Sequence, residues 1–264
     1  MGRAVEPPLM VSEPPLPTFI IIGAQKSGTR WLRQNLGRHP EIFTAPREVR
    51  YFNHRKRVDA LGSEWYRMQF EGWAGEPITG EATPGYMMLG HHPAEVAARI
   101  RASVPDVKLI ALLRNPVDRA YSAFVHHKRE ERIHPRARLL DVARSCAPED
   151  DWMGIISGGW YAASLQPYLE LFGDRLLVVL HDDIGPDPRR VYERAVRHVG
   201  AEPGFVPPAL DKVVFSNRGE AEAGPGVSAT ERSRLFEYFR GDVDRLEQML
   251  GRDLSMWRPP DCAR

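Results

Sequence analysis

Residues 18–30 read TFIIIGAQKSGTR and carry the strongest fold signal in the chain. The β-branched run at 19–22 has the length and composition of a buried strand. Gly23 and Gly28 bound a short turn after it, and an apolar helical pattern begins at Trp31. A strand, a glycine-bounded turn and a helix in this order make the first half of a βαβ unit.

Helices and buried strands alternate through the rest of the chain. Apolar periodicity predicts five further elements: helices at 92–103, 116–125 and 161–172, and strands at 107–113 and 176–180. Asn115 is placed to cap the helix that starts at Pro116. Ser228 and Glu231 predict a capping box for a helix that continues to about Leu250. Apolar strands alternating with helices predict an α/β fold with a central parallel sheet covered on both faces.

The predicted elements leave several segments without regular structure. We expect the Pro-rich residues 1–17 to form a flexible tail, and residues 18–264 to form a single domain. Residues 54–79, 130–159 and 203–227 are expected to be loops around a site rather than separate domains.

The composition excludes several classes of protein. A formal charge of +1, from 36 Lys+Arg against 35 Asp+Glu, argues against a nucleic-acid binder. No apolar run approaches the roughly 18–20 residues of a membrane span, and the N-terminus lacks the layout of a signal peptide. Cys146 and Cys262 cannot make a disulfide framework, which indicates a reducing compartment. We therefore expect a cytoplasmic protein without nucleic-acid or membrane partners.

The glycine-bounded turn has the five-residue glycine spacing of a Walker A loop, which aims backbone N–H groups at an anion. A Walker A loop places Lys directly after its second Gly, but here Thr29 takes that position and Lys26 lies inside the turn. The strand at 107–113 ends in Arg114 instead of a metal-binding Asp. A Mg-dependent nucleotide kinase is therefore disfavoured. Phosphate binding remains favoured over a purely structural turn with a solvated Lys.

A second phosphate-binding signal lies at 114–122, which reads RNPVDRAYS. Arg114 follows a strand, where parallel sheets place their ligands, and Ser122 lies two turns into the next helix. A guanidinium and a hydroxyl from these positions could converge on one phosphate. The alternative is a surface Arg and an ordinary helix Ser.

With these two motifs, the chain resembles the sulfotransferases that use 3′-phosphoadenosine 5′-phosphosulfate. It is most similar to the branch that contains the heparan sulfate sulfotransferases and their bacterial relatives. Further segments match that branch in order: 47–52, 65–70, 80–86, 159–161, 217–219 and 250–257. The resemblance implies a P-loop-like three-layer α/β/α domain, and an acceptor that is a small molecule, a glycan or a secondary metabolite.

The resemblance also implies roles for particular residues. The donor would be held by nine of them: Lys26, Ser27, Gly28, Thr29, Arg30, Arg114, Ser122, Arg218 and Gly219. Lys26 would act catalytically on the bridging oxygen of the donor. A compact ammonium suits one oxygen better than the fork of Arg, and Lys26 is one of only five lysines. No metal is expected, because the sulfuryl group carries less charge than a terminal phosphate.

Glu48 matches the residue that takes the acceptor's proton in this branch, and we expect it to be the general base. Five histidines are rival bases: His54, His91, His92, His126 and His127. Arg47, Arg50, Tyr51 and Asn53 depart from the branch's usual residues around Glu48, which argues for an acceptor other than heparan sulfate. Two other functions stay open, a P-loop nucleotide kinase and a non-catalytic nucleotide-binding protein.

Overall fold

The structure, a computed structural model, describes residues 13–145, 151–208, 210–211 and 226–260. Its core is a five-stranded sheet in the order β2-β3-β1-β4-β5, and every neighbouring pair is parallel. The strands are β1 (Phe19–Gly23), β2 (Ile42–Thr44), β3 (Ile78–Ala82), β4 (Lys108–Leu113) and β5 (Leu176–Leu180). The central position of β1 confirms that the strand before the glycine-bounded turn organises the sheet.

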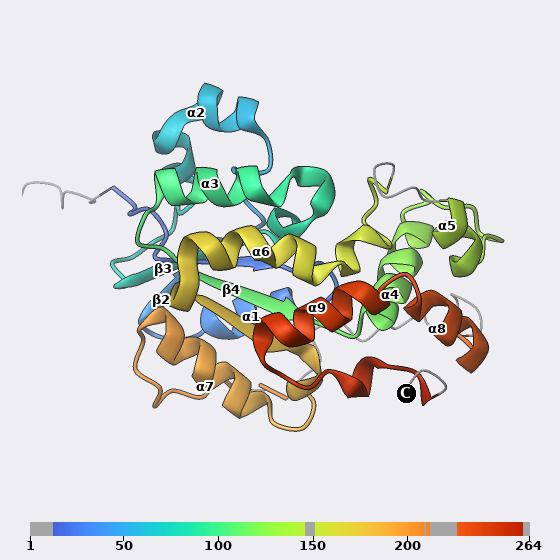
Figure 1. Cartoon of the computed structure of the whole chain (residues 1–264). Coiled ribbons are helices and arrows are strands. Elements are labelled where there is room, and N and C mark those ends of the chain that lie inside the picture. Colours follow the sequence, from blue (N-terminus) through green and yellow to red (C-terminus); the bar gives the residue numbers. More distant parts are fainter. Residues whose placement is uncertain (1–12, 146–150, 209, 212–225, 261–264) are drawn as a thin grey trace, which may run out of the picture.

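Helices cover both faces of this sheet (Figure 1). One face packs against α3 (Pro93–Ser103) and α6 (Tyr161–Phe172), and α9 (Arg240–Leu250) packs on α6. The other face packs against α1 (Thr29–Leu36) and α7 (Pro188–Val199). Because side chains alternate along a strand, Ile20 and Ile22 join the first core cluster, whereas Phe19 and Ile21 join the second. The predicted three-layer α/β/α architecture is confirmed.

The remaining helices lie around the sheet. α2 (Arg55–Met68) lies beyond α3, and α4, α5 and α8 gather together at one side of the fold (Figure 1). Their bounds are α4 (Pro116–Arg129), α5 (Leu139–Ser145) and α8 (Ala229–Phe236). Short 3₁₀ turns complete the described elements at Pro84–Met87, Leu89–His91, Ser157–Gly159, Gly173–Arg175, His181–Asp183 and Ser255–Trp257.

The two predicted helix caps are confirmed. The side chain of Asn115 accepts hydrogen bonds from the backbone N–H of Val117 at 3.0 Å and of Asp118 at 3.4 Å. Ser228 and Glu231 form a reciprocal capping box at the start of α8. In both cases a side chain takes the place of the missing partners of the first-turn N–H groups.

The prediction of one helix from Ser228 to Leu250 is wrong. α8 ends at Phe236, and α9 starts at Arg240. The Trp160 indole N–H, from the residue that precedes α6, donates to the carbonyl of Tyr238 at 2.8 Å, so this carbonyl is held by a side chain instead of by the next helical turn. A tertiary contact therefore sets the break.

Two of the predicted loops contain regular structure. Residues 54–79 include α2 and the start of β3, and residues 130–159 include α5. The prediction also missed β2 and β3. β3 reads ITGEA and lacks a continuous apolar pattern, yet all of its residues are buried. Its polar side chains are satisfied by hydrogen bonds to Leu16, Tyr66, Thr83 and Tyr86, which hydrophobic periodicity cannot show.

Residues 13–17 of the predicted tail lie against the domain. Arg67 donates a hydrogen bond to the Pro14 carbonyl at 3.2 Å, and the Thr79 hydroxyl donates to the Leu16 carbonyl at 3.1 Å. Residues 1–12 lie outside the described part of the chain. Among the described residues, none of the helices is both long enough and apolar enough to cross a membrane.

Candidate active site

Three neighbouring strands end at the same edge of the sheet and bring the candidate residues together. The N–H of Ala24, directly after β1, donates to the Leu112 carbonyl of β4 at 2.7 Å. On the other side, the N–H of Thr83, directly after β3, donates to the Ile21 carbonyl at 3.0 Å. The carboxyl ends of parallel strands are where open α/β sheets bind ligands.

The turn after β1 leads directly into α1. Gly28 has φ 94°, a left-handed conformation that costs other residues energy. No side chain caps α1, as is also the case for α2, α3, α6 and α9, whereas side chains cap α4, α7 and α8. The first-turn N–H groups of α1 are therefore available to an anion at the turn. This geometry fits the phosphosulfate end of the predicted donor.

Lys26 occupies the tip of this turn with a left-handed backbone, φ 70°, and its side chain is half-buried. Burial, together with the charges of Arg119 and Arg129, lowers the pKa of Lys26 to about 8. The carboxylates of Glu130 and Glu48 oppose this shift. The predicted general base therefore lies within electrostatic reach of the predicted catalytic Lys, although the two are separated by 22 positions in sequence.

Arg114 lies beside the turn. Its guanidinium donates to the Lys26 carbonyl at 3.4 Å, and its own carbonyl accepts a hydrogen bond from the Tyr161 hydroxyl at 2.9 Å. Tyr161 is also close to the side chain of Ser27. Ser122 is buried on the second turn of α4. Within the described residues, no hydrogen bond joins Arg114 to Ser122, so a shared phosphate contact remains a prediction.

The motif at 114–122 also contains Arg119, for which the sequence analysis predicted no role. Arg119 is fully buried, and its guanidinium donates to the Ile155 carbonyl. Its Nε and Nη1 atoms have no partner among the described residues. Burial lowers the pKa of Arg119. Buried N–H donors that lack an acceptor are rare, and these lie in the positively charged surroundings of Lys26, which fits an anionic ligand.

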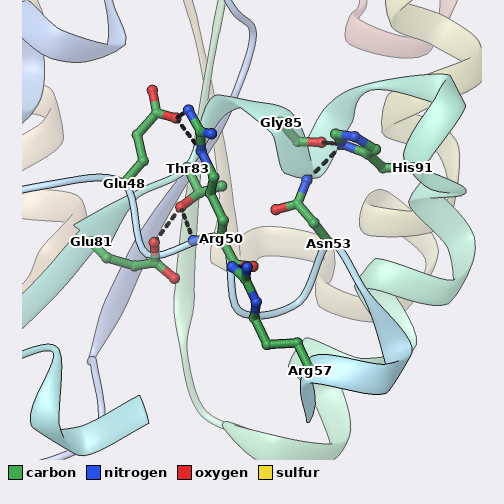
Figure 2. A network of polar contacts seen from close by, with 8 residues as sticks. All are labelled: Glu48, Arg50, Asn53, Arg57, Glu81, Thr83, Gly85 and His91. Carbon is green, nitrogen blue, oxygen red and sulfur yellow. Dashed lines mark hydrogen bonds and ion pairs between the residues drawn. The ribbon is translucent and has the colours of Figure 1, made fainter. Parts of the chain in front are cut away.

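Glu48 lies on the segment that follows β2, and its side chain is exposed. Figure 2 shows the Arg50 guanidinium on the Glu48 carboxylate: Nη2 and Nε donate to the same oxygen, Oε2, at 2.7 and 3.0 Å. Arg50 has a left-handed backbone, φ 55°. The other oxygen of Glu48, Oε1, accepts no hydrogen bond from the described residues, so it faces the solvent side of the ion pair with free lone pairs.

Below this segment lies a buried carboxylate, Glu81 of β3. The hydroxyls of Tyr66 and Tyr86 donate to its Oε1, each at 2.8 Å, and the Thr83 hydroxyl donates to its Oε2 at 2.6 Å. Burial raises the pKa of Glu81, while these three hydrogen bonds and the nearby Val49 backbone lower it. The sequence analysis included residues 80–86 only as a matching segment, and a Glu inside a short strand was the signal that it overlooked.

Four of the five rival histidines form two groups, and the fifth, His92, precedes α3 with a left-handed backbone, φ 54°. His54 and His91 pack edge to face with ring centres 5.9 Å apart, and His91 also contacts the Asn53 amide at 2.6 Å. His126 and His127 lie on α4 near Lys26, whose charge lowers the pKa of both in addition to burial. No cluster of three or more His, Cys, Asp or Glu side chains suited to a metal ion occurs within the described ranges.

Five predicted donor residues remain, and the structure describes three of them. Thr29 and Ser27 are buried in the turn, and Arg30 is exposed at the start of α1. Arg218 and Gly219 lie outside the described residues, so their predicted closure over the donor is not placed.

A glycine-bounded turn at the end of a central parallel strand, with cations around it, defines the class of α/β proteins that bind a phosphorylated ligand. The sequence profile of the sulfotransferase domain matches residues 16–218. The chain belongs to this family and is a sulfotransferase. The nucleotide kinase and non-catalytic alternatives are therefore not favoured.

Similar proteins cover most of the chain. Heparan sulfate glucosamine 3-O-sulfotransferase 6 from Homo sapiens is 29% identical over 259 residues, which cover 90% of this chain and 73% of that protein. The bifunctional heparan sulfate N-deacetylase/N-sulfotransferase 4 from Mus musculus is 27% identical, and the match covers 92% of this chain but 31% of that protein. The crystal structure of a sulfotransferase from Alicyclobacillus acidocaldarius superposes with a TM-score of 0.73 at 28% identity, covering 91% and 98% of the two chains.

Proposed function

We propose that this sulfotransferase moves the sulfuryl group of 3′-phosphoadenosine 5′-phosphosulfate to a hydroxyl or amine of its acceptor by in-line displacement. The acceptor atom forms a bond to sulfur while the bond from sulfur to the bridging oxygen breaks, and 3′-phosphoadenosine 5′-phosphate leaves. The uncapped start of α1 beside Lys26 is the single observation that carries this proposal.

The donor would be held at two places. Lys26 contacts the bridging oxygen and stabilises the charge that develops on it, while Ser27, Gly28, Thr29 and Arg30 surround the 5′ end. At the other end, Arg114 and Ser122 bind the 3′-phosphate, and Arg218 and Gly219 cover the nucleotide. The contact between the Arg114 guanidinium and the Lys26 carbonyl supports a continuous donor site, because it joins the two places directly.

Glu48 would accept the proton that the acceptor loses. Its Oε1 atom is the oxygen for this step, because Arg50 already occupies Oε2. The electrostatic interaction between Glu48 and Lys26 supports a base close to the reacting sulfur. His126 is a second candidate base, since it also lies near Lys26 and forms no hydrogen bond with the described residues.

The acceptor would be a small molecule, a glycan or a secondary metabolite. Heparan sulfate is the acceptor in the names of several relatives, and the Arg50 and Asn53 departures beside Glu48 support a different one here. The low cysteine content supports a cytoplasmic enzyme, and the Arg-rich composition together with the Alicyclobacillus relative supports a bacterial source. We also propose that residues 18–264 form one domain, against which residues 13–17 of the predicted tail are held by hydrogen bonds to the Pro14 and Leu16 carbonyls.

Transfer of labelled sulfate from the donor tests the proposal. Acceptors would include heparan sulfate oligosaccharides, phenols, hydroxyl-bearing metabolites and water. We expect Lys26→Met and Glu48→Gln to lose turnover, while the donor product still binds Glu48→Gln. Lys108→Met and Glu193→Gln are matched controls. Lys108 is the first residue of β4, at the end of the strand opposite to the proposed donor site, and Glu193 forms ion pairs with two arginines of α7. Full turnover in Lys26→Met would sink the proposal.

A further inference from the structure

The segment that carries Glu48 is attached to the protein through an unusual set of hydrogen bonds. Three consecutive backbone N–H groups, at residues 50–52, donate to side chains instead of to a neighbouring strand. Backbone N–H groups need partners when they are buried, and Val49, Tyr51 and Phe52 are all buried. The positions of Glu48 and Arg50 therefore depend on the side chains that accept these bonds.

All of these acceptors lead to Glu81. The Val49 backbone lies close enough to Glu81 to lower the pKa of its carboxyl group. The Arg50 N–H donates to the Thr83 hydroxyl at 3.1 Å, and this hydroxyl in turn donates to Glu81 at 2.6 Å (Figure 2). A single buried carboxylate thus holds the left-handed backbone of Arg50, whose side chain pairs with the proposed base.

Tyr86 forms the second branch of the same network. Its hydroxyl accepts the N–H of Tyr51 at 3.2 Å and that of Phe52 at 3.4 Å, and it donates to Glu81 at 2.8 Å. Tyr66 differs in one respect: its hydroxyl donates to the same oxygen of Glu81 at 2.8 Å, but it accepts no bond from residues 49–52. The chain therefore contains a matched pair of tyrosines.

We propose that Glu81 is a positioning residue for sulfuryl transfer: acting through Thr83 and Tyr86, it fixes the backbone of residues 49–52 and so aims Glu48 at the acceptor. Glu81 is fully buried on β3 and does not touch the reacting groups. Its carboxylate is suited to this task because two oxygens can accept several hydrogen bonds, whereas an amide would accept fewer. The proposal rests on the proposed role of Glu48 as the base.

Tyr86→Phe and Tyr66→Phe test the positioning role in the full chain. Each variant keeps the aromatic ring and removes one 2.8 Å hydrogen bond to Glu81, so we expect both to lower the melting temperature, Tyr86→Phe by more. Tyr86→Phe alone leaves two N–H groups of the segment without an acceptor. We expect its turnover to fall at least about tenfold, with turnover of Tyr66→Phe within about twofold of wild type, because small misplacements of a reacting group are costly.

Thr83→Val and Thr83→Ser form a second pair, which is useful because Glu81→Gln risks misfolding. Valine keeps the shape of Thr83 but removes the acceptor of the Arg50 N–H, whereas serine keeps the hydroxyl. We expect only Thr83→Val to lower turnover, again by at least about tenfold. Affinity for 3′-phosphoadenosine 5′-phosphate should stay within about twofold of wild type in every variant, because the network does not contact the donor turn.

Amide hydrogen exchange at residues 49–52 gives a readout that needs no acceptor. Exchange should accelerate in Tyr86→Phe and Thr83→Val but not in Tyr66→Phe or Thr83→Ser. Equal exchange within either pair, or equal turnover of the two tyrosine variants, would overturn the proposal. If Glu48→Gln keeps full turnover, Glu48 is not the base, and the proposal that Glu81 aims it is rejected. Unequal hydrogen exchange within the variant pairs would still establish that Glu81 holds the backbone of this segment.

Discussion

Raising the pH from 7 to 9 should weaken binding of 3′-phosphoadenosine 5′-phosphate through one group, Lys26. Its pKa is lowered to about 8, chiefly because its ammonium is half-buried and secondly because Arg119 lies near it. The ammonium is therefore protonated below pH 8 and loses its proton as the pH rises through that value. An anion at the turn then loses its nearest flexible cation.

The size of the effect follows from this pKa. About nine tenths of Lys26 is protonated at pH 7 and about one tenth at pH 9. If the product binds only the protonated form, the dissociation constant rises about tenfold over this range, or about 1.4 kcal/mol. At pH 8, binding should take up about half a proton, since the bound anion draws Lys26 back to its charged form.

Isothermal titration calorimetry in buffers of different ionisation enthalpy measures both quantities. The phosphates of the ligand, with a second pKa of about 6, stay ionised throughout this range. Burial lowers the pKa values of His126 and His127, which moves their titration away from this pH range. Lys26→Arg is the control: arginine keeps its charge, so its affinity should not change between pH 7 and 9.

The reasoning is refuted if wild type binds equally well at pH 7 and 9. It is also refuted if Lys26→Arg shows the same pH dependence as wild type, because another group would then be responsible. In Lys26→Arg we further expect the product to bind nearly as well at pH 7 while turnover falls strongly, since the planar fork does not reproduce a point charge at one oxygen.

Three other substitutions separate catalysis, donor binding and stability. Glu48→Gln should lower turnover by about 10² to 10⁴-fold in the labelled-sulfate assay and leave the dissociation constant of the product unchanged, and weaker product binding would contradict its role as a base. Gly28→Ala should cost about 1–2 kcal/mol in denaturant unfolding because of the left-handed φ of 94°, and should also weaken product binding; unchanged binding would show that the turn tolerates a side chain. Ser228→Ala should cost about 1 kcal/mol of unfolding free energy by removing the cap of α8, with normal turnover, and a loss of turnover would link α8 to the site.

The β1–turn–α1 unit, the Asn115 cap of α4 and the strand at 176–180 were predictable from the sequence, because each depends on interactions between residues that are close in the chain. The donor turn with Lys26 belongs to the same group. The break between α8 and α9 was not predictable, because the Trp160 indole that holds the Tyr238 carbonyl is 78 positions away.

Local sequence thus predicted a phosphate-binding turn and a parallel sheet, and carried a resemblance that named the candidate residues. Folding supplied what a linear pattern cannot contain: the pKa of Lys26, the approach of Glu48 to it, and the attachment of residues 49–52 to Glu81. These properties arise from burial and from hydrogen bonds between distant segments. Both burial and these hydrogen bonds form only when the strands and helices pack against each other and remove water from between them.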